Sequence, residues 1–274
     1  NGAAYVQPVL LSLDHGFTCH GSNDQVLNLN PPVGHQIQQA NITASAYSGR
    51  SFLSSTAISR ATGDKQSFID ATGHIVQSLS KSFTHMMEAT HWYGGSGLAT
   101  VTGATAALAV NSVEITAANA AAFLWLGGEG MPVDIYDSTG TSLVLSTEVT
   151  KVKVGQAYDD SSADKITLVL ASVVGLSNGT SYIIFRKGYN GLEGAGLKKI
   201  LTTDSIFGIN GANFGLWKAN RYTASAALSF SVLSTAIARS IGRGLTGPLM
   251  GMVNPRAFRS LMPDYASLGD QGTT

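Results

Sequence analysis

The chain has 274 residues, of which 44% are apolar, enough for one large or two modest domains with a sizeable core. Only 12% of the residues are charged, and the 17 basic and 17 acidic residues cancel. The composition therefore excludes a strong overall charge as a means of attracting nucleic acid, anionic lipid or a charged substrate.

The low charge has two interpretations. A surface of Ser, Thr, Asn and Gln repels copies of itself only weakly, which suits a protein that buries its exterior in assemblies; an ordinary uncharged exterior fits equally well. The single cysteine, Cys19, excludes an internal disulfide and any zinc site with several cysteine ligands. No run of about 18 apolar residues is present to span a membrane. The chain begins with Asn and has no signal-peptide pattern, so a processed or partial N-terminus is expected.

The first sixty residues are predicted to be extended. Residues 1–24 are mixed in character with scattered glycines, which predicts an arm. Residues 25–61 are predicted to form a long hairpin that turns at Pro31–Gly34 and returns from His35. Its Ser/Thr-rich strands carry few bulky apolar residues, so the hairpin is expected to find its packing partners elsewhere.

Residues 67–91 are predicted to form one long amphipathic helix that ends at Gly94-Gly95. Its apolar or methyl-bearing residues recur at steps of three and four: Phe68, Ile69, Thr72, Ile75, Val76, Leu79, Phe83, Met86, Met87 and Thr90. At 1.5 Å per residue the helix is roughly 37 Å long. Such a length is typical of the spine of an extended structure.

Residues 99–187 change character and predict a small β-domain. Turn-forming residues separate five strand candidates, at Val113–Thr116, Pro132–Tyr136, Leu143–Val154, Lys165–Val173 and Ser181–Arg186. A short helix is expected from about Ala117 to Leu126. The regular spacing indicates a small barrel or sandwich.

The last part of the chain is predicted to mix helix and strand. A helix is expected over Ser229–Ile241, followed by a short apolar strand at Leu249–Val253. Asn254-Pro255 is a typical helix start, with Asn as the N-cap, and that helix should end before Pro263.

Two groups of residues suggest metal chemistry. His15, Cys19 and His20 are the only Cys/His cluster, but zinc sites need a fixed geometry and usually a fourth ligand, so a plain arm is preferred. Glu88 and His91 match one half of a di-iron carboxylate site, which requires a second such pair on a facing helix. We interpret that match as coincidence.

Three glycine or aspartate patterns also fall short. Gly242–Gly247 fits G-x-G-x-x-G, but it follows a helix where a dinucleotide site follows a strand, so a helix exit is the simpler interpretation. Asp160, Ser162 and Asp164 begin like a calcium loop that lacks its Gly and closing Glu. Gly94–Gly97 lacks the last glycine of a nucleophile elbow.

Histidines 74, 85 and 91 are predicted on the polar side of the long helix, where a solvated or hydrogen-bonded role is expected. The sequence thus offers no catalytic residue, no cofactor-binding residue and no metal ligand, and predicts no enzyme activity.

Three segments, in this order, carry a resemblance to a known family. The first is KQSFIDATGHIVQSLSKSFTHMMEATHWYGGSG at Lys65–Gly97, the second is GLEGAGLKKILTTDSIFGINGANFGLWKAN at Gly191–Asn220, and the third is LMGMVNPRAFRSLM at Leu249–Met262. Together with the preceding hairpin, they resemble the major capsid proteins of tailed double-stranded-DNA bacteriophages, which have the Hong Kong 97 fold.

The resemblance implies an α+β Hong Kong 97-type capsid fold with an inserted small β-barrel or sandwich domain. The implied parts are an N-terminal arm (1–24), an extended E-loop (25–61), a peripheral domain with its spine helix (62–98), the inserted β-domain (99–187) and the remaining peripheral and axial elements (188–274). The implied function is structural: self-assembly, as hexamers and pentamers, into the icosahedral head of a virion built in the host cytoplasm.

The implied partners are other copies of the chain, with portal, scaffolding and decoration proteins as further candidates. Contact with packaged DNA would be non-specific and would involve phosphates. The closest approach to a basic cluster is Arg239, Arg243, Arg256 and Arg259, for which a solvated face is the default. The main alternative function is a β-rich surface adhesin or fibre module, suggested by residues 99–187 and the low charge.

Overall fold

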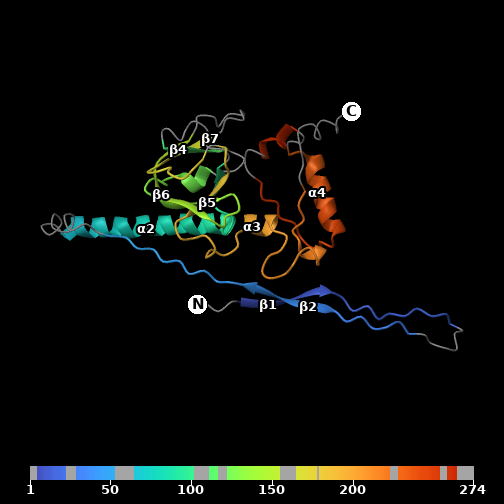
Figure 1. The fold of residues 1–274 in the computed structure, drawn as a ribbon. Coiled ribbons are helices and arrows are strands. Elements are labelled where there is room, and N and C mark those ends of the chain that lie inside the picture. The colour runs from blue at the N-terminus through green and yellow to red at the C-terminus, as the bar shows by residue number, and fades with distance from the viewer. Residues whose placement is uncertain are drawn as a thin grey trace. The chain divides into compact units, whose positions relative to one another are not determined.

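The protein is described by a computed structural model that covers residues 5–22, 29–52, 65–101, 111–116, 122–154, 165–177, 179–222, 228–253 and 258–263 (Figure 1). Helices and strands are mixed along the chain. The fold divides into two compact units. The first comprises Asn1–Gln7 and Asn41–Ile200, and the second comprises Pro8–Ala40 and Leu201–Thr274.

The long helix is confirmed as α2, Lys65–Tyr93. It ends where the next residues are Gly94 and Gly95, and Gly95 adopts a φ of +67° that favours glycine. The predicted single apolar face is not buried as one surface. Ala89 is buried, whereas Val76, Phe83 and Met87, which lie between a third and almost half of a turn around the helix from Ala89, stay exposed. The contacts of α2 therefore cover one edge of its apolar face and leave the other uncovered.

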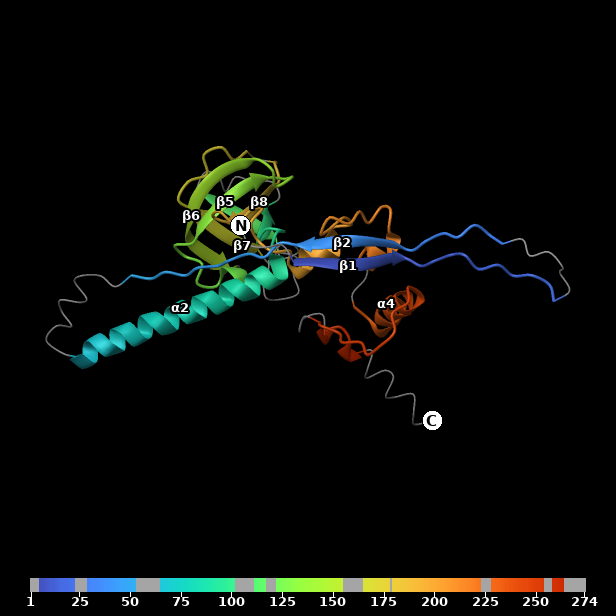
Figure 2. The same cartoon turned by 90° about the horizontal axis from the view of Figure 1, so that it is seen from below.

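Six antiparallel strands form a nearly closed barrel, one of the two architectures that the strand spacing predicts (Figure 2). Their order around the sheet is β3-β8-β5-β6-β7-β4, and the two end strands, β3 and β4, lie beside each other. The bounds are β3 Ala99–Val101, β4 Ser112–Thr116, β5 Pro132–Asp137, β6 Leu143–Val154, β7 Lys165–Leu170 and β8 Tyr182–Arg186. Each of the five predicted strands is present, with β7 three residues shorter than expected.

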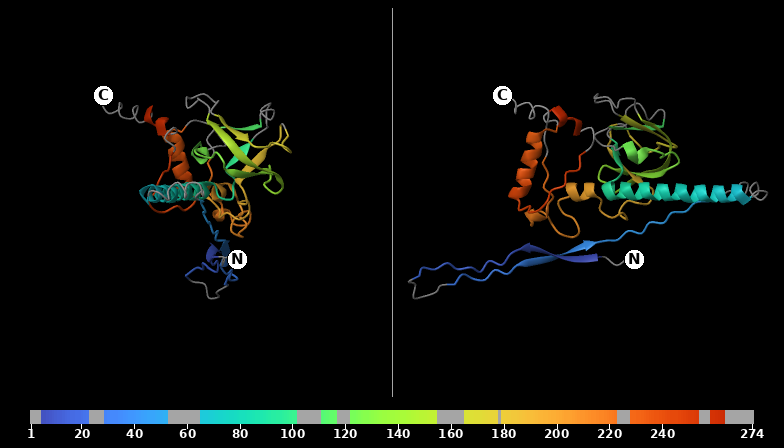
Figure 3. Two further views of the ribbon diagram at one scale, coloured as in Figure 1. Left: turned by 90° about the vertical axis from the view of Figure 1, so that its left-hand side faces the viewer. Right: turned by 180° about the vertical axis from the view of Figure 1, so that it is seen from behind.

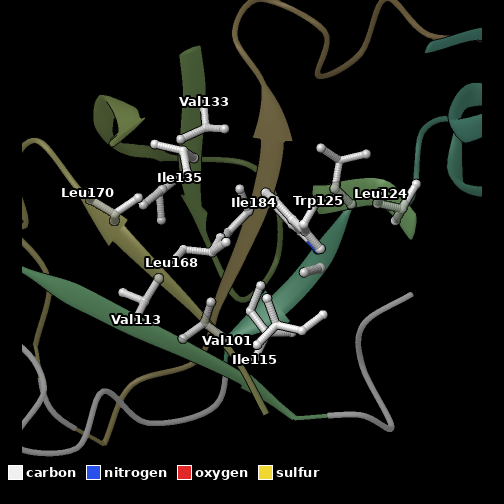
Figure 4. Packing of buried hydrophobic residues seen from close by; sticks show 14 of the residues in the cluster. Val101, Val113, Ile115, Leu124, Trp125, Val133, Ile135, Leu168, Leu170 and Ile184 are labelled. Carbon is white, nitrogen blue, oxygen red and sulfur yellow. The ribbon is translucent and has the colours of Figure 1, made fainter. Parts of the chain in front are cut away.

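The barrel encloses the main hydrophobic core (Figure 4). Alternate residues of the strands point inward, as the period of two requires, and include Val133 and Ile135 on β5. The predicted helix at 117–126 is a single 3-10 turn, η3 Ala122–Trp125, in its described part, and it contributes fully buried Leu124 and Trp125. Ala89 of α2 belongs to the same core, so the barrel and the end of the helix are packed together.

The N-terminal ribbon (residues 5–22 and 29–42) differs from the predicted hairpin. Strand β1, Tyr5–Ser12, pairs with β2, Gln36–Ile42, so the predicted arm supplies one side of the ribbon (Figure 3). The predicted turn at Pro31–Gly34 is wrong, because Val33 lies on the return side and exchanges backbone hydrogen bonds with His15 at 2.8 and 3.1 Å. Pro31 and Pro32 lack an N–H. Each strand of a two-stranded ribbon is an edge strand, where a proline at a position whose N–H would face solvent costs no hydrogen bond between the strands. The predicted strand at 25–30 falls mostly outside the described residues.

The remaining elements are α3 Leu197–Thr202, η4 Gly215–Trp217 and α4 Phe230–Gly242. The predicted helix at 229–241 is confirmed as α4, with Ser229 as its N-cap. The predicted strand at Leu249–Val253 is wrong: the segment has no strand structure, because no described strand lies alongside to take up its backbone hydrogen bonds. The Asn254-Pro255 helix start lies outside the described residues.

Candidate functional site

The exit of α2 meets two other parts of the first unit at a close junction. Gly94 and Gly196 approach backbone to backbone, and the Gly196 N–H donates to the Gly94 carbonyl at 2.8 Å. A Cβ on Gly94 would lie 2.4 Å from the Gly194 carbonyl oxygen. Glycine is therefore required at this position for packing, in addition to ending the helix.

A small pocket of about 190 Å³ opens beside this junction. Its lining residues are Ser45, Ala46, Tyr47, Ser48, Gly188, Tyr189, Leu192 and Glu193. The Tyr47 and Tyr189 ring centroids lie 6.0 Å apart, and the Ser45 hydroxyl donates to the Leu192 carbonyl at 2.7 Å. These contacts fasten the segment that follows β2 to the residues that follow the barrel.

Glu193 is the charged residue of the pocket. Its carboxylate accepts a hydrogen bond from the Gly95 N–H at 2.8 Å. Burial raises the pKa of the Glu193 carboxyl, and this hydrogen bond and the charges of Arg186 and Lys199 offset only part of the increase. No sequence pattern marks Glu193, because its partner is a backbone group almost one hundred residues earlier.

The pocket is built to hold the chain in place. Its lining contains an acid and hydroxyl groups, but no histidine, cysteine or lysine that could act as a base toward Ser45 or Ser48. The Ser45 proton is directed at a carbonyl oxygen. This arrangement joins segments of the fold.

The metal candidates are not brought together. In the described part of the chain, no three His, Cys, Asp or Glu side chains are placed to share a metal ion. Cys19 is an exposed thiol, and the backbone of His15 pairs with Val33. Glu88 and His91 are both exposed on α2. The Asp160–Asp164 calcium-like turn lies outside the described residues.

The glycine patterns are helix exits. After α4, the Gly244 N–H donates to Ile241 and the Leu245 N–H donates to Ser240, which is the Schellman arrangement, and Gly244 has a φ of +90°. The interpretation of Gly242–Gly247 as a helix exit is thereby confirmed.

His85 is hydrogen-bonded through Nε2 to the Phe123 carbonyl at 2.7 Å, so it lies toward the barrel and not on a solvated face.

The predicted basic cluster has a different membership in the structure. Arg239 lies over the Tyr222 ring, 4.4 Å from its centroid, and Arg243 donates to the Gly215 carbonyl at 2.6 Å. Lys218 and Arg221 lie between Gly215 and Tyr222 in the sequence, and both pair with Asp204. Arg256 lies outside the described residues. The sequence misses Lys218 and Arg221, because they lie about twenty residues away from the arginines of α4.

Large apolar side chains are exposed along two segments. On the ribbon and the segment after it, Phe17 and Phe52 are each 86% exposed and Leu29 is 72% exposed. Beyond α4 the exposed residues are Leu245, Leu249, Met250, Met252, Val253, Phe258 and Met262. Clusters of this kind mark surfaces that bind other molecules.

No described helix is long and apolar enough to cross a membrane. Comparisons with protein-family models, with curated proteins and with solved structures found no match to this chain.

Proposed function

We propose that this chain is a major capsid protein of a tailed double-stranded-DNA bacteriophage, of the Hong Kong 97 type. In this proposal it is a structural protein without enzyme activity. Copies of it associate as hexamers and pentamers and close into the icosahedral head of the virion, around DNA that they contact without sequence specificity.

The exposed apolar residues of the ribbon carry this proposal. A two-stranded ribbon is at best marginally stable in water by itself. Phe17 and Leu29 belong to the two opposing segments of this ribbon, and most of their surface is open to solvent. Burying each against a neighbouring subunit would contribute about 1.5–3 kcal/mol. A closed shell repeats every such contact many times, so modest contacts are sufficient for a stable particle.

The second unit supports the same proposal. Four residues in its described part are buried, namely Ala40, Ile209, Gly211 and Leu261, and α4 has none. A folded domain normally buries a contiguous core of its own. Contacts with other copies would supply the apolar cover that this unit does not provide for itself. The long helix followed by a Gly-rich exit, which carries the resemblance, is consistent with a shell subunit.

A ribbon variant tests the proposal. Replacing Phe17 and Leu29 together with serine (F17S/L29S) should abolish particles, as measured by sedimentation velocity and negative-stain microscopy, while the melting temperature of the barrel stays within 2 °C or so of wild type. The matched control is L126S/V174S, which removes two other largely exposed apolar side chains beside the barrel.

The control variant should still assemble. Normal particles from F17S/L29S would contradict the role of the ribbon. Fibres from the wild-type chain would favour the alternative function, a fibre or adhesin module.

A further inference from the structure

The charge of the chain is unevenly distributed. The whole sequence is neutral, but the C-terminal segment of the second unit, Leu201–Thr274, contains six basic residues and three acidic ones, Asp204, Asp264 and Asp270. Four of the six come together in the second unit, where the segment 215–222 packs against the C-terminal half of α4. These four are defined here as the basic cluster: Lys218, Arg221, Arg239 and Arg243.

Hydrogen bonds hold this cluster in one place. The Asn220 amide donates to the Ser240 hydroxyl at 2.9 Å and joins the two segments. The Arg243 guanidinium donates to the Gly215 carbonyl at 2.6 Å and to the Asn220 side-chain oxygen at 3.5 Å. Asp204 pairs with both Lys218 and Arg221. Asp204 thus pairs with two of the four cations, and no ion pair among the described residues compensates Arg239 or Arg243.

Arg239 is the best placed of the four for an external ligand. Its guanidinium lies over the Tyr222 ring at 4.4 Å, and among the described residues no hydrogen bond or ion pair engages it. A stacked guanidinium is preorganised and keeps its N–H groups free for bidentate contact with a phosphate. Arg221, Arg239 and Arg243 are all exposed. Cations near a helix C-terminus also stabilise the helix dipole, but that effect does not require Lys218 or Arg221.

We propose that the basic cluster binds the phosphate backbone of double-stranded DNA. The proposal rests on the proposed function, because it names the residues that would make the non-specific DNA contact. Exposed cations suit phosphates, and contacts to phosphates carry no sequence information. The basic cluster would then present to DNA a local positive charge that the neutral composition conceals.

The test is the salt dependence of binding by the full-length chain. A fluorescent 30-base-pair duplex is titrated with protein at 50, 100, 150 and 200 mM NaCl, with fluorescence anisotropy as the readout. Each phosphate contact contributes about 0.9 to the slope of log K against log [salt]. The variant R239Q/R243Q should therefore reduce the magnitude of this slope by about 1.8. The variant R239K/R243K, which keeps both charges, should keep the slope.

The matched control is K151Q/K153Q, which removes two exposed cations from β6 of the barrel. It should leave the slope unchanged. Thermal melts of all variants identify any loss of folding, and the lysine variant then provides the comparison. An unchanged slope in R239Q/R243Q, or an equal decrease in the control, would overturn the proposal. So would competition by polyglutamate as strong as that by DNA of equal charge, because the surface would then fit an acidic protein segment.

Assembly is measured separately, by sedimentation of the same samples. Particles with an unchanged slope in R239Q/R243Q would refute the DNA surface and leave the capsid proposal standing. A lowered slope in a chain that never assembles would support the DNA surface and refute the capsid proposal.

Discussion

At the scale of single residues, the junction beside α2 depends on close backbone contact. Gly94 is buried against Gly194 and Gly196, whereas Gly73, inside the same helix, has open space where its Cβ would be. The two glycines have opposite reasons for being present. One makes room for another chain segment, and the other only adds conformational freedom to the unfolded state.

Alanine at these two positions should therefore have opposite effects. G94A forces the backbone apart and should destabilise the protein by about 1–3 kcal/mol. G73A removes a flexible residue from an exposed helix interior and should stabilise it by about 0.5–1 kcal/mol. Urea denaturation followed by far-UV circular dichroism measures both. Equal effects of the two changes would contradict the close approach at Gly94.

Glu193 should make stability depend on pH. Its folded-state pKa is raised, chiefly by burial, above the ordinary value of 4.5. The folded protein then holds this proton more tightly than the unfolded chain, so the contribution of Glu193 to stability falls as pH rises from 4.5 through the folded pKa. E193Q removes this dependence.

Thermal melts between pH 4.5 and pH 7.5 test this sign. The difference in melting temperature, E193Q minus wild type, should increase as pH rises from 4.5 and should level off above the folded pKa of Glu193. The control is E129Q, which removes an exposed carboxyl from the same unit. A difference between E193Q and wild type that falls with pH, or that the control reproduces, would show that burial does not dominate at Glu193.

At the scale of elements, the barrel contains most of the buried apolar residues of the described chain. Trp125 is fully buried inside it, and Ile115, Ile135, Leu168 and Ile184 surround the same core. The end of α2 adds Ala89 to this core, so an isolated barrel loses a small part of its cover. Most of its apolar burial is internal, which predicts that the barrel folds by itself.

The fragment 99–187 provides a direct spectroscopic test. Trp125 is its single tryptophan, because Trp92 and Trp217 lie outside it. The fragment should show blue-shifted tryptophan emission and dispersed amide signals by NMR. Emission like that of tryptophan in water, with signals collapsed to random-coil positions, would mean that the barrel needs the end of α2 to fold.

The elements differ in how far the sequence predicts them. Helix α2 and the barrel strands follow from local periodicity and turn chemistry, which depend on neighbouring residues. The ribbon does not, because the pairing of His15 with Val33 is between distant residues and Pro31-Pro32 resembles a turn. Leu249–Val253 has the composition of a strand but no partner among the described strands, and strand formation requires one.

The candidate sites were harder to predict than the elements. The Glu193–Gly95 contact and the joining of Lys218 and Arg221 to the arginines of α4 are tertiary contacts. Local patterns carry no information about them. The exposure of the ribbon's apolar residues could be anticipated in part, since the sequence predicts strands with too little apolar material for a core of their own.

At the scale of the whole molecule, apolar cover is unequal between the two units. The first unit encloses a barrel core, whereas the described part of the second unit buries few residues and exposes an apolar segment beyond α4. Exposed apolar surface of this kind promotes association in water. The proposed self-assembly would account for both the exposed ribbon and the sparsely buried second unit.

The most direct test of this account is the state of the purified full-length chain. Sedimentation velocity with negative-stain microscopy should show closed particles, or hexamers and pentamers that convert to closed particles as concentration rises. A chain that stays monomeric at high concentration, or one that forms only open fibres, would contradict the proposal that this protein builds a shell.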